Sequence, residues 1–355
     1  MSKVSFNNKQ NLFFKTLKTK VDLYFSDNEI HTSGNRKLYI KSAIQVGTAI
    51  GLYVWLVFFT PPIALSIFLC CVLGINLGVI GFNVMHEGGH NSFSKHTWLN
   101  ETSGHFLNIL GGNIHFWKIK HNINHHTYTN IEGMDSDIDI LPYMRTNEAQ
   151  PRYWFHRFQH IYWVILYGIS YVVWIFMEDF VKYFSGKIGQ LKTANTFNLK
   201  EHIIFWVTKI MYVVVYIVIP IFMVGPLNAF VGFSIVVFVC GLAISIVFQM
   251  AHVVEDTQFP TPDENSKINQ EWALHQVSTT ANFATKSKVV SWLLGGLNFQ
   301  VEHHLFPKIS HVHYPQINKM LKETCAQFNV PYIEYPSIVS AFGSHLAHIK
   351  RLGRA

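Results

Sequence analysis

Charged residues are scarce in this chain of 355 residues: Asp, Glu, Lys and Arg make up 14% of it, against about 25% in soluble domains. Cysteine is also rare. The four cysteines are Cys70, Cys71, Cys240 and Cys325, from which neither a disulfide framework nor a cysteine metal site can be built. No tract rich in Gly, Ser or Pro and no internal repeat divides the chain. We therefore expect one integral domain, residues 42–355, after a short N-terminal segment.

The N-terminal segment, residues 1–41, is polar and basic, and it is too charged for a cleavable signal peptide. Leu12, Phe13, Leu17 and Val21 stand among lysines, a pattern that predicts a basic amphipathic helix lying on the membrane surface. The net charge of +7 is then explained by flanks that face anionic lipid headgroups. No nucleic acid partner is needed to account for it.

Long apolar runs predict a membrane protein. A bilayer core of about 30 Å is crossed by a helix of about 20 apolar residues. Four runs reach this length: residues 42–60, 62–85, 203–225 and 228–250. Lys209 is the only charged residue within them. The first two runs meet at Thr60-Pro61-Pro62 and the last two at Gly225-Pro226-Leu227, so we predict four transmembrane helices in two tight hairpins of an all-α fold.

Three histidine clusters accompany these runs. They are His86-Glu-Gly-Gly-His90, His121-Asn-Ile-Asn-His125-His126 and Gln300-Val-Glu-His303-His304. Residues four apart on a helix differ by only about 40° around its axis, so a pair with this spacing can direct its ring nitrogens at one point. Neutral imidazole suits iron, copper, zinc and nickel alike. Seven histidines exceed what one metal ion needs, so the clusters predict a site for two.

A fifth apolar run, residues 161–177, has to be placed by counting crossings. If the clusters build one site, an even number of crossings separates the second cluster from the third. As a helix, this run would reach only about 25 Å. We therefore interpret it as an interfacial or half-inserted helix. Lysine and arginine crowd the segment before the first run and are missing from both hairpin turns, which predicts cytoplasmic termini and a cytoplasmic, histidine-rich cap that carries the site.

Two other classes of protein have to be weighed. The first cluster also fits the H-E-x-x-H pattern of an intramembrane zinc metalloprotease, in which Glu87 would be the general base beside two zinc-binding histidines. Catalytic zinc takes three protein ligands, however, which leaves the other clusters unused. Gly88 and Gly89 would each weaken a helix by up to about 1 kcal/mol. A metal transporter would need ionisable residues inside the membrane, and the apolar runs offer almost none.

In this order around two apolar hairpins, the clusters resemble the histidine boxes of the integral-membrane fatty acid desaturase superfamily. The third box opens with Gln300, which makes it similar to the third box of the front-end branch. Members of that branch insert a double bond between an existing one and the carboxyl end. Further matches are His125-His126-Thr127-Tyr128-Thr129-Asn130, residues 249–252 and residues 279–283. The likeness runs from about Gly81 to Tyr332.

The resemblance implies two iron ions held mainly by histidines, with O2 as co-substrate. The implied ligands are His86, His90, His121, His125, His126, His252, His303 and His304. His275 is a further candidate, and Gln300 stands where many relatives have histidine, so it is expected to act from behind the ligands or through water. The carboxylates expected to accept the second ring N–H of these histidines are Glu87, Glu302, Asp135, Asp137 and Asp139. For the three aspartates, a solvated acidic loop is the alternative.

The reaction implied by the resemblance is the desaturation of a long fatty acyl chain. Hydroxylation of an acyl chain or lipid on the same scaffold is the alternative outcome, and acyl-CoA, acyl-carrier protein and membrane lipid are all open as forms of the substrate. Many front-end desaturases carry a fused cytochrome b5 domain with a His-Pro-Gly-Gly motif, which these 355 residues do not contain. We therefore expect electrons from a separate ferredoxin, rubredoxin or cytochrome b5-like donor.

Overall fold

The fold is mostly helical. The structure is a computed structural model that describes residues 4–8, 11–189, 191–192 and 197–355. Five helical stretches in this part of the chain are long and apolar enough to cross a membrane: Arg36–Phe58, Ile63–Gly89, Trp154–Ser185, Leu199–Val224 and Pro226–His252. The prediction of a helical protein with spans is confirmed, but there is one candidate span more than the four runs predict. The third stretch contains the ambiguous residues 161–177.

The chain divides into two compact units. Unit 1 comprises Met1–Gly34, Lys120–Tyr162 and Val247–Ala355, and unit 2 comprises Asn35–Ile119 and Trp163–Ile246. Unit 2 holds most of the long helices, several of which are interrupted by π-helical turns. In chain order it contains α2 (Arg36–Phe58), α3 (Ile63–Ile80), η1 (Gly81–Met85), α4 (His86–Gly89), α5 (Thr97–Gly104), α6 (Phe106–Ile109), α7 (Ile114–Trp117), η4 (Trp174–Glu178), α10 (Asp179–Ser185), β2 (Lys187–Ile188), β3 (Leu191–Lys192), α11 (Leu199–Val213), η5 (Val214–Val218) and α12 (Ile219–Val224). Three helices belong to both units: η2 (Lys118–His125), α9 (Gln159–Val173) and α13 (Pro226–His252).

Both predicted hairpins are present. The first joins α2 to α3 through Pro61 and Pro62, which cannot continue a helix. The second joins α12 to α13 at Gly225, whose φ of +81° lies in the region that glycine adopts without strain. The long helices continue past the predicted runs to Gly89 and to His252. The first histidine pair and His252 therefore lie on the last turns of long helices.

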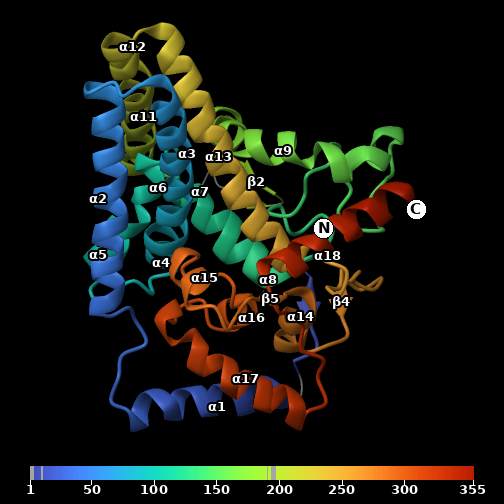
Figure 1. Cartoon of the computed structure of the whole chain (residues 1–355). Coiled ribbons are helices and arrows are strands. Elements are labelled where there is room, and N and C mark those ends of the chain that lie inside the picture. The colour runs from blue at the N-terminus through green and yellow to red at the C-terminus, as the bar shows by residue number, and fades with distance from the viewer. Residues whose placement is uncertain (1–3, 9–10, 190, 193–196) are drawn as a thin grey trace. The chain divides into compact units, whose positions relative to one another are not determined.

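Within unit 2, helix α9 crosses the other long helices. Figure 1 shows α9, in green, running across the direction of α2, α3 and α11. Glycines let α9 and α13 approach closely: a Cβ at Gly168 would lie 2.0 Å from the ring of Phe238, and a Cβ at Gly241 would lie 2.6 Å from the carbonyl oxygen of Gly168. Any larger side chain at these positions would separate the two helices.

The single charge of the apolar runs, Lys209, is buried and fully bonded inside unit 2. Its Nζ donates to Asp179 Oδ2 at 2.9 Å and to the carbonyl oxygens of Ile175 at 2.7 Å and Gly111 at 2.5 Å. A buried ammonium is tolerated only when its charge is paired and its donors are satisfied. Lys209 therefore joins α11 to η4, to α10 and to the turn before α7.

Unit 1 is built from short helices and two pairs of very short strands. In chain order it contains β1 (Ser5–Phe6), α1 (Leu12–Asp27), α8 (His126–Tyr128), the 3-10 turn η3 (Trp154–Phe158), β4 (Lys267–Ile268), α14 (Trp272–Thr279), β5 (Asn282–Phe283), α15 (Lys288–Leu293), α16 (Gln300–Leu305), the 3-10 turn η6 (His311–His313), α17 (Tyr314–Gln327), β6 (Glu334–Tyr335) and α18 (Ile338–Arg354). β1 pairs in parallel with β4, and β5 pairs in parallel with β6. Both pairs join segments that are far apart in the sequence.

The N-terminal helix α1 is amphipathic as predicted, but its apolar face does not lie on a membrane. Phe13, Leu17, Val21 and Phe25 repeat every four residues and are buried at 0–8% exposure. They pack in one core with residues of α14, α16 and α17, among them Val301. The expectation of a membrane-lying helix was wrong, because the sequence pattern shows that a helix face is apolar but not what covers it.

The C-terminal helix α18 is held in unit 1 by two buried histidines. The Nδ1 of His345 donates to the carbonyl oxygen of Val253 at 2.6 Å, and the Nε2 of His348 donates to that of Thr146 at 3.1 Å. Burial lowers the pKa of both imidazoles to about 4. The folded helix therefore binds fewer protons than the unfolded chain, whose histidines titrate near pH 6.5.

This difference predicts that the docking of α18 depends on pH. The stabilising contribution of His345 and His348 is present above about pH 6.5 and is lost as pH falls toward 4. Hydrogen exchange of the α18 amides, corrected for intrinsic rates, should show weaker protection at pH 5 than at pH 7.5. In a His345→Asn, His348→Gln variant, which keeps the donors, the dependence should be much smaller. The exposed His31→Asn should behave as wild type, and an unchanged dependence in the double variant would contradict the assignment.

Candidate metal centre

The second histidine box lies on a π-helical turn. η2 carries His121 and His125, and α8 begins with His126. A π-helix bonds residue i to i+5, and such turns are common at functional sites. The rings of His121 and His125 stack with their centroids 5.0 Å apart, and His126 Nε2 lies 3.3 Å from His121 Nε2. The spacing predicted that these rings gather, although an ordinary α-helix was expected.

A second group of rings in unit 1 comes from three separate segments. His125 from η2, His252 from the end of α13 and His304 from α16 are each wholly buried. The ring centroid of His252 lies 4.6 Å from that of His125 and 4.9 Å from that of His304. The centroids of His125 and His304 are 4.8 Å apart. The three imidazoles thus converge although His125 and His304 are 179 residues apart in the chain.

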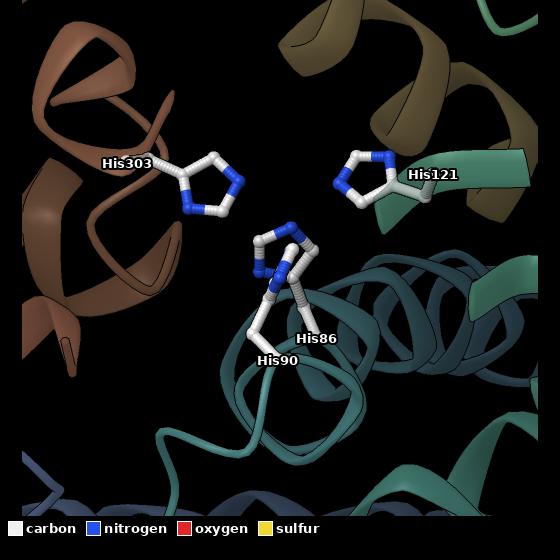
Figure 2. Close-up of side chains that lie close together, drawn as sticks. All are labelled: His86, His90, His121 and His303. Atoms are coloured by element: carbon white, nitrogen blue, oxygen red, sulfur yellow. The ribbon is translucent and has the colours of Figure 1, made fainter. Parts of the chain in front are cut away.

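His303, the neighbour of His304 on α16, meets the second box from another side. Its ring centroid lies 4.6 Å from that of His126 and 6.2 Å from that of His121. Figure 2 shows the rings of His121 and His303 facing each other. Adjacent residues on a helix point in directions about 100° apart. The two rings therefore point apart, and His304 belongs both to the group of His125 and His252 and to a group with His126 and His303.

Two aspartates orient the second box from behind. The ring Nδ1 of His125 lies 2.9 Å from Asp135, and that of His121 lies 2.9 Å from Asp137. Burial alone would lower the pKa of His125, but Asp135 outweighs it and raises the pKa. Burial lowers the pKa of His121 despite Asp137, whereas Lys120 and His121 hold the pKa of Asp137 well below its usual range against burial. A carboxylate at Nδ1 keeps the proton there and presents Nε2 as a ligand atom.

The third box is oriented by neutral groups. His304 Nδ1 donates to Gln276 Oε1 at 2.9 Å, and the hydroxyl of Thr129 lies 3.2 Å from the same nitrogen. His303 Nδ1 lies 3.2 Å from the hydroxyl of Tyr314. No sequence pattern pointed to Gln276 or Tyr314, because each reaches its histidine from another helix. Thr129 was noticed only as part of a motif.

Two predicted supporting carboxylates have partners other than histidine. Glu302 accepts hydrogen bonds from the amides of Asn282 and Asn318, each at 2.7 Å. Burial raises the pKa of Glu302 to about 7, although these two amides oppose the shift. Asp139 accepts from the backbone N–H of Leu141 at 3.1 Å. Glu302 therefore ties α16 to β5 and α17, and Asp139 shapes the loop after the second box.

Gln300 lies at the edge of the second group of rings. Its side-chain Nε2 is 3.0 Å from His252 Nε2 and 3.3 Å from His304 Nε2. An amide N–H donates to these nitrogens only when they carry lone pairs, as His304 does when its Nδ1 holds the proton. His275, the further candidate, packs its ring against Phe6, 5.0 Å between centroids. It belongs to none of the groups that bring three or more ligand atoms together among the described residues.

The first box lies on the last turn of the helix α3–η1–α4 in unit 2. The ring centroids of His86 and His90 are 4.6 Å apart, and both rings pack against Trp117, at 5.6 and 5.4 Å. Figure 2 shows both side chains leaving the same helix. Glu87 accepts a hydrogen bond from the hydroxyl of Ser92 at 3.1 Å. The two histidines share one helix face, as their spacing predicted.

The two glycines of the first box are required by packing. A Cβ at Gly88 would lie 2.3 Å from the backbone nitrogen of Gly104, and one at Gly89 would lie 2.3 Å from the ring of Trp117. Their low helix propensity counted against a helical metalloprotease motif in the sequence. In the fold, the same glycines let α5 and an aromatic ring approach the histidine pair.

The ligand atoms of unit 1 fit a metal ion. One ring nitrogen from each of His125, His252 and His304 lies within 4.8 Å of the others, and the same holds for His126, His303 and His304. In the part of the chain that the structure describes, Nε2 of His125 is buried without a hydrogen-bond partner. A buried polar atom in this state is costly unless something binds it. Imidazole nitrogens gathered in this way suit iron, copper, zinc or nickel.

Asn130 connects the parts of this centre, and sequence reasoning had noticed it only as part of a motif. Its side-chain amide donates to three carbonyl oxygens: His252 at 2.9 Å, Gln258 at 3.1 Å and Thr279 at 3.2 Å. Its backbone N–H donates to Asp135 at 3.0 Å. Asn130 is wholly buried and has a φ of +59°, which asparagine tolerates better than most residues. It therefore fixes the position of His252 relative to the second histidine box.

Comparison with known proteins places this centre in a family. A family model described as fatty acid desaturase matches residues 33–336. An acyl-lipid (8-3)-desaturase of Physcomitrium patens is 35% identical over 345 residues, which cover 96% of this chain and 72% of the relative. An sn-1 linoleoyl-lipid 6-desaturase of Arthrospira platensis is 34% identical over 354 residues, which cover 99% of this chain and 95% of the relative. A Synechocystis protein with the same name is 32% identical over 349 residues, which cover 97% and 96%.

The class that fold and site define is a membrane oxidoreductase with buried histidine clusters that could bind metal. The chain belongs to the fatty acid desaturase family, since the family model covers most of its length, including all three boxes. The resemblance found in the sequence is confirmed. The metalloprotease interpretation of the first box is not supported, because the match extends across all the histidine clusters.

The role of Asn130 can be tested by an isosteric change. Asn130→Asp removes the amide donors and places a carboxylate against three carbonyl oxygens, so His252 should shift. We expect metal content to fall and activity to drop by roughly 10–100-fold, as for other groups that orient metal ligands. Metal analysis and product yield measure both effects. The control is Asn329→Asp, which has a similar φ of +54° but is exposed. Full metal content in Asn130→Asp would rule out the proposed role.

Proposed function

We propose that this protein is an O2-dependent desaturase that inserts a double bond into an acyl chain of a membrane lipid, with front-end regiochemistry. The convergence of His125, His252 and His304, in a chain that matches desaturases over nearly its whole length, carries the proposal. Gln300 at the start of the third box supports the front-end branch. The names of three relatives, which specify acyl-lipid or linoleoyl-lipid substrates, support a lipid-bound chain.

We propose that two iron ions are the resident metals. His125, His252 and His304, with His126 beside them, would hold one iron. The remaining histidines of the three boxes, His86, His90, His121 and His303, would be the ligands of the other, as membership of the desaturase family suggests. Bound iron would supply the oxidation of an unactivated methylene by O2, which no side chain can perform. This division uses each predicted histidine once and gives both ions a nitrogen-rich ligand set.

The chain's own groups would hold this centre ready. Asp135 and Asp137 keep protons on Nδ1 of His125 and His121, and the hydrogen bond from His304 to Gln276 does the same for the third box. The rings are buried, so bulk water is kept from the site. Orientation matters because a misplacement of about 1 Å can cost about 100-fold in rate. Gln300, beside two ligand rings, would act from behind them or through water, because a ring nitrogen bound to iron has no second lone pair to accept from its amide.

The electrons would come from a separate ferredoxin, rubredoxin or cytochrome b5-like protein. The membrane arrangement we propose has four crossings, with α9 at the interface and both termini, together with the histidine boxes, on the cytoplasmic side. Its support is the direction of α9 across α2, α3 and α11, the basic N-terminal flank and the uncharged hairpin turns.

Product analysis tests the activity. The chain should be expressed in a host that lacks such a desaturase, and the double bonds in each lipid class should be located by mass spectrometry. We expect a new double bond on the carboxyl side of an existing one, and purified protein with two irons per chain.

Single substitutions test the residues. His125→Ala should abolish the product without loss of membrane insertion, and Glu87→Gln should lower the product yield by roughly 10–100-fold. The exposed His96→Ala is the matched control. A hydroxylated product would overturn the proposal.

Topology mapping tests the membrane arrangement. Tags at Lys187 and after Ala355 should be cytoplasmic, whereas tags in the turns at residues 60–62 and 225–227 should be outside. These outcomes follow from four crossings and from the positive-inside tendency. Accessibility to a membrane-impermeant reagent in intact and opened cells measures them. If the tag at Lys187 is outside, residues 161–177 cross the membrane and the proposed arrangement is wrong.

A further inference from the structure

One surface of unit 1 combines exposed aromatic side chains with cations, and the metal centre uses none of it. Its members come from η3 with the residues around it and from the end of α18: Arg152, Trp154, Arg157, Phe158, Ile161, Lys350 and Arg354. We call it the η3–α18 surface. Trp154 is 74% exposed, Ile161 64% and Phe158 43%, so three large apolar side chains lie open on this surface together with the cations. The four cationic side chains are exposed as well.

The η3–α18 surface is rigid, although its parts are about 200 residues apart in the sequence. Arg152 Nε donates to the carbonyl oxygen of Gly353 at 3.1 Å, and Gln159 Nε2 donates to that of Ile349 at 2.6 Å. Gly353 lies so close to η3 that a Cβ would be 2.1 Å from the carbonyl oxygen of His156. The end of α18 is therefore locked against η3, and the cations of both segments act together.

The positive charge of this surface is not neutralised by the protein. Arg351, on the same helix, is paired with Glu148 at 2.7 Å. No Asp or Glu side chain of the described residues pairs with Arg157, Lys350 or Arg354. Arg157 instead lies over the ring of Phe158, 4.8 Å from its centroid. The surface thus offers free cations directly beside exposed rings.

The apolar side chains of the surface continue into α9. Phe158, at the end of the 3-10 turn η3, and Ile161 and Ile165, on α9, recur at intervals of three and four residues, which favours one helix face, and Trp154 opens the turn before them. All four are at least 43% exposed. An acidic protein partner would account for the cations but would leave the continuing aliphatic stripe uncovered. A bilayer accounts for both, because tryptophan settles at the headgroup level and lysine and arginine attract anionic headgroups.

We propose that the η3–α18 surface binds the anionic headgroups of the lipid leaflet, with Trp154 and Phe158 inserted at headgroup level beside Arg157, Lys350 and Arg354. The ligand class is a phospholipid with a net negative charge. This site is distinct from the histidine cluster and does not depend on the reaction performed there. It would fix the start of α9 at the membrane boundary.

Tryptophan quenching in lipid nanodiscs tests the site. The chain has nine tryptophans, so the signal of Trp154 is taken as the difference between wild type and Trp154→Phe. Discs contain equal amounts of phosphatidylglycerol and phosphatidylcholine, with bromine on the acyl chains of one or the other. We expect brominated phosphatidylglycerol to quench this signal at least about twofold more than brominated phosphatidylcholine. The preference should decline at high salt, because screening weakens exposed charges.

Charge variants complete the test. In the triple variant Arg157→Gln, Lys350→Gln, Arg354→Gln, the two brominated lipids should quench the Trp154 signal equally. The control is the triple variant Lys15→Gln, Lys308→Gln, Lys319→Gln, which removes the same amount of charge from other exposed positions. It should keep the stronger quenching by brominated phosphatidylglycerol. Melting temperatures show whether each variant folds, and the salt series on wild type serves as an independent measurement. Equal quenching in wild type, or no quenching of Trp154 by either lipid, overturns the proposal; the second result would point to a protein partner instead.

Discussion

The hydrogen bonds behind the buried imidazole rings are the interactions on which the rest of this structure depends. An imidazole offers a lone pair to a metal only when its other nitrogen holds the proton, and burial by itself does not choose between the two nitrogens. Asp135 makes this choice for His125 and Gln276 makes it for His304. Each acceptor belongs to a different segment of unit 1. The chemistry of the centre therefore requires these segments to fold together.

The long helices place histidines on their last turns. His86 and His90 follow the π-helical turn η1, and His252 ends α13. A π-helical turn shifts the face on which the following residues lie, so a small change in winding re-aims an entire histidine box. Apolar helices accept charge only where it is paired, as Lys209 is with Asp179. Because the apolar helices carry so few charged residues, the histidines that could bind metal lie at the helix ends.

The segments outside the boxes give the centre its surroundings. Helix α1 covers the back of α16 through Phe13 and Leu17, and the third box is buried as a result. Helix α18 bonds to Val253, next to His252, and so stabilises the turn after the last long helix. Asn130 joins the same turn to the second box. In a desaturase, where an acyl carbon has to be presented accurately, rigidity of this kind has a direct catalytic purpose.

The sequence alone determined the helical membrane fold, because helical periodicity and hydrophobic run length are local properties, and the resemblance of the histidine boxes indicated the class of the protein. The four-residue spacing of His86 and His90 already implied a shared helix face, and the apolar runs implied hairpins. Tertiary structure alone decided the partners. Gln276 reaches His304, Asn282 reaches Glu302 and α17 covers the apolar face of α1, and no local pattern distinguishes these choices from others. Contacts between distant segments depend on how the whole chain packs, which periodicity cannot express.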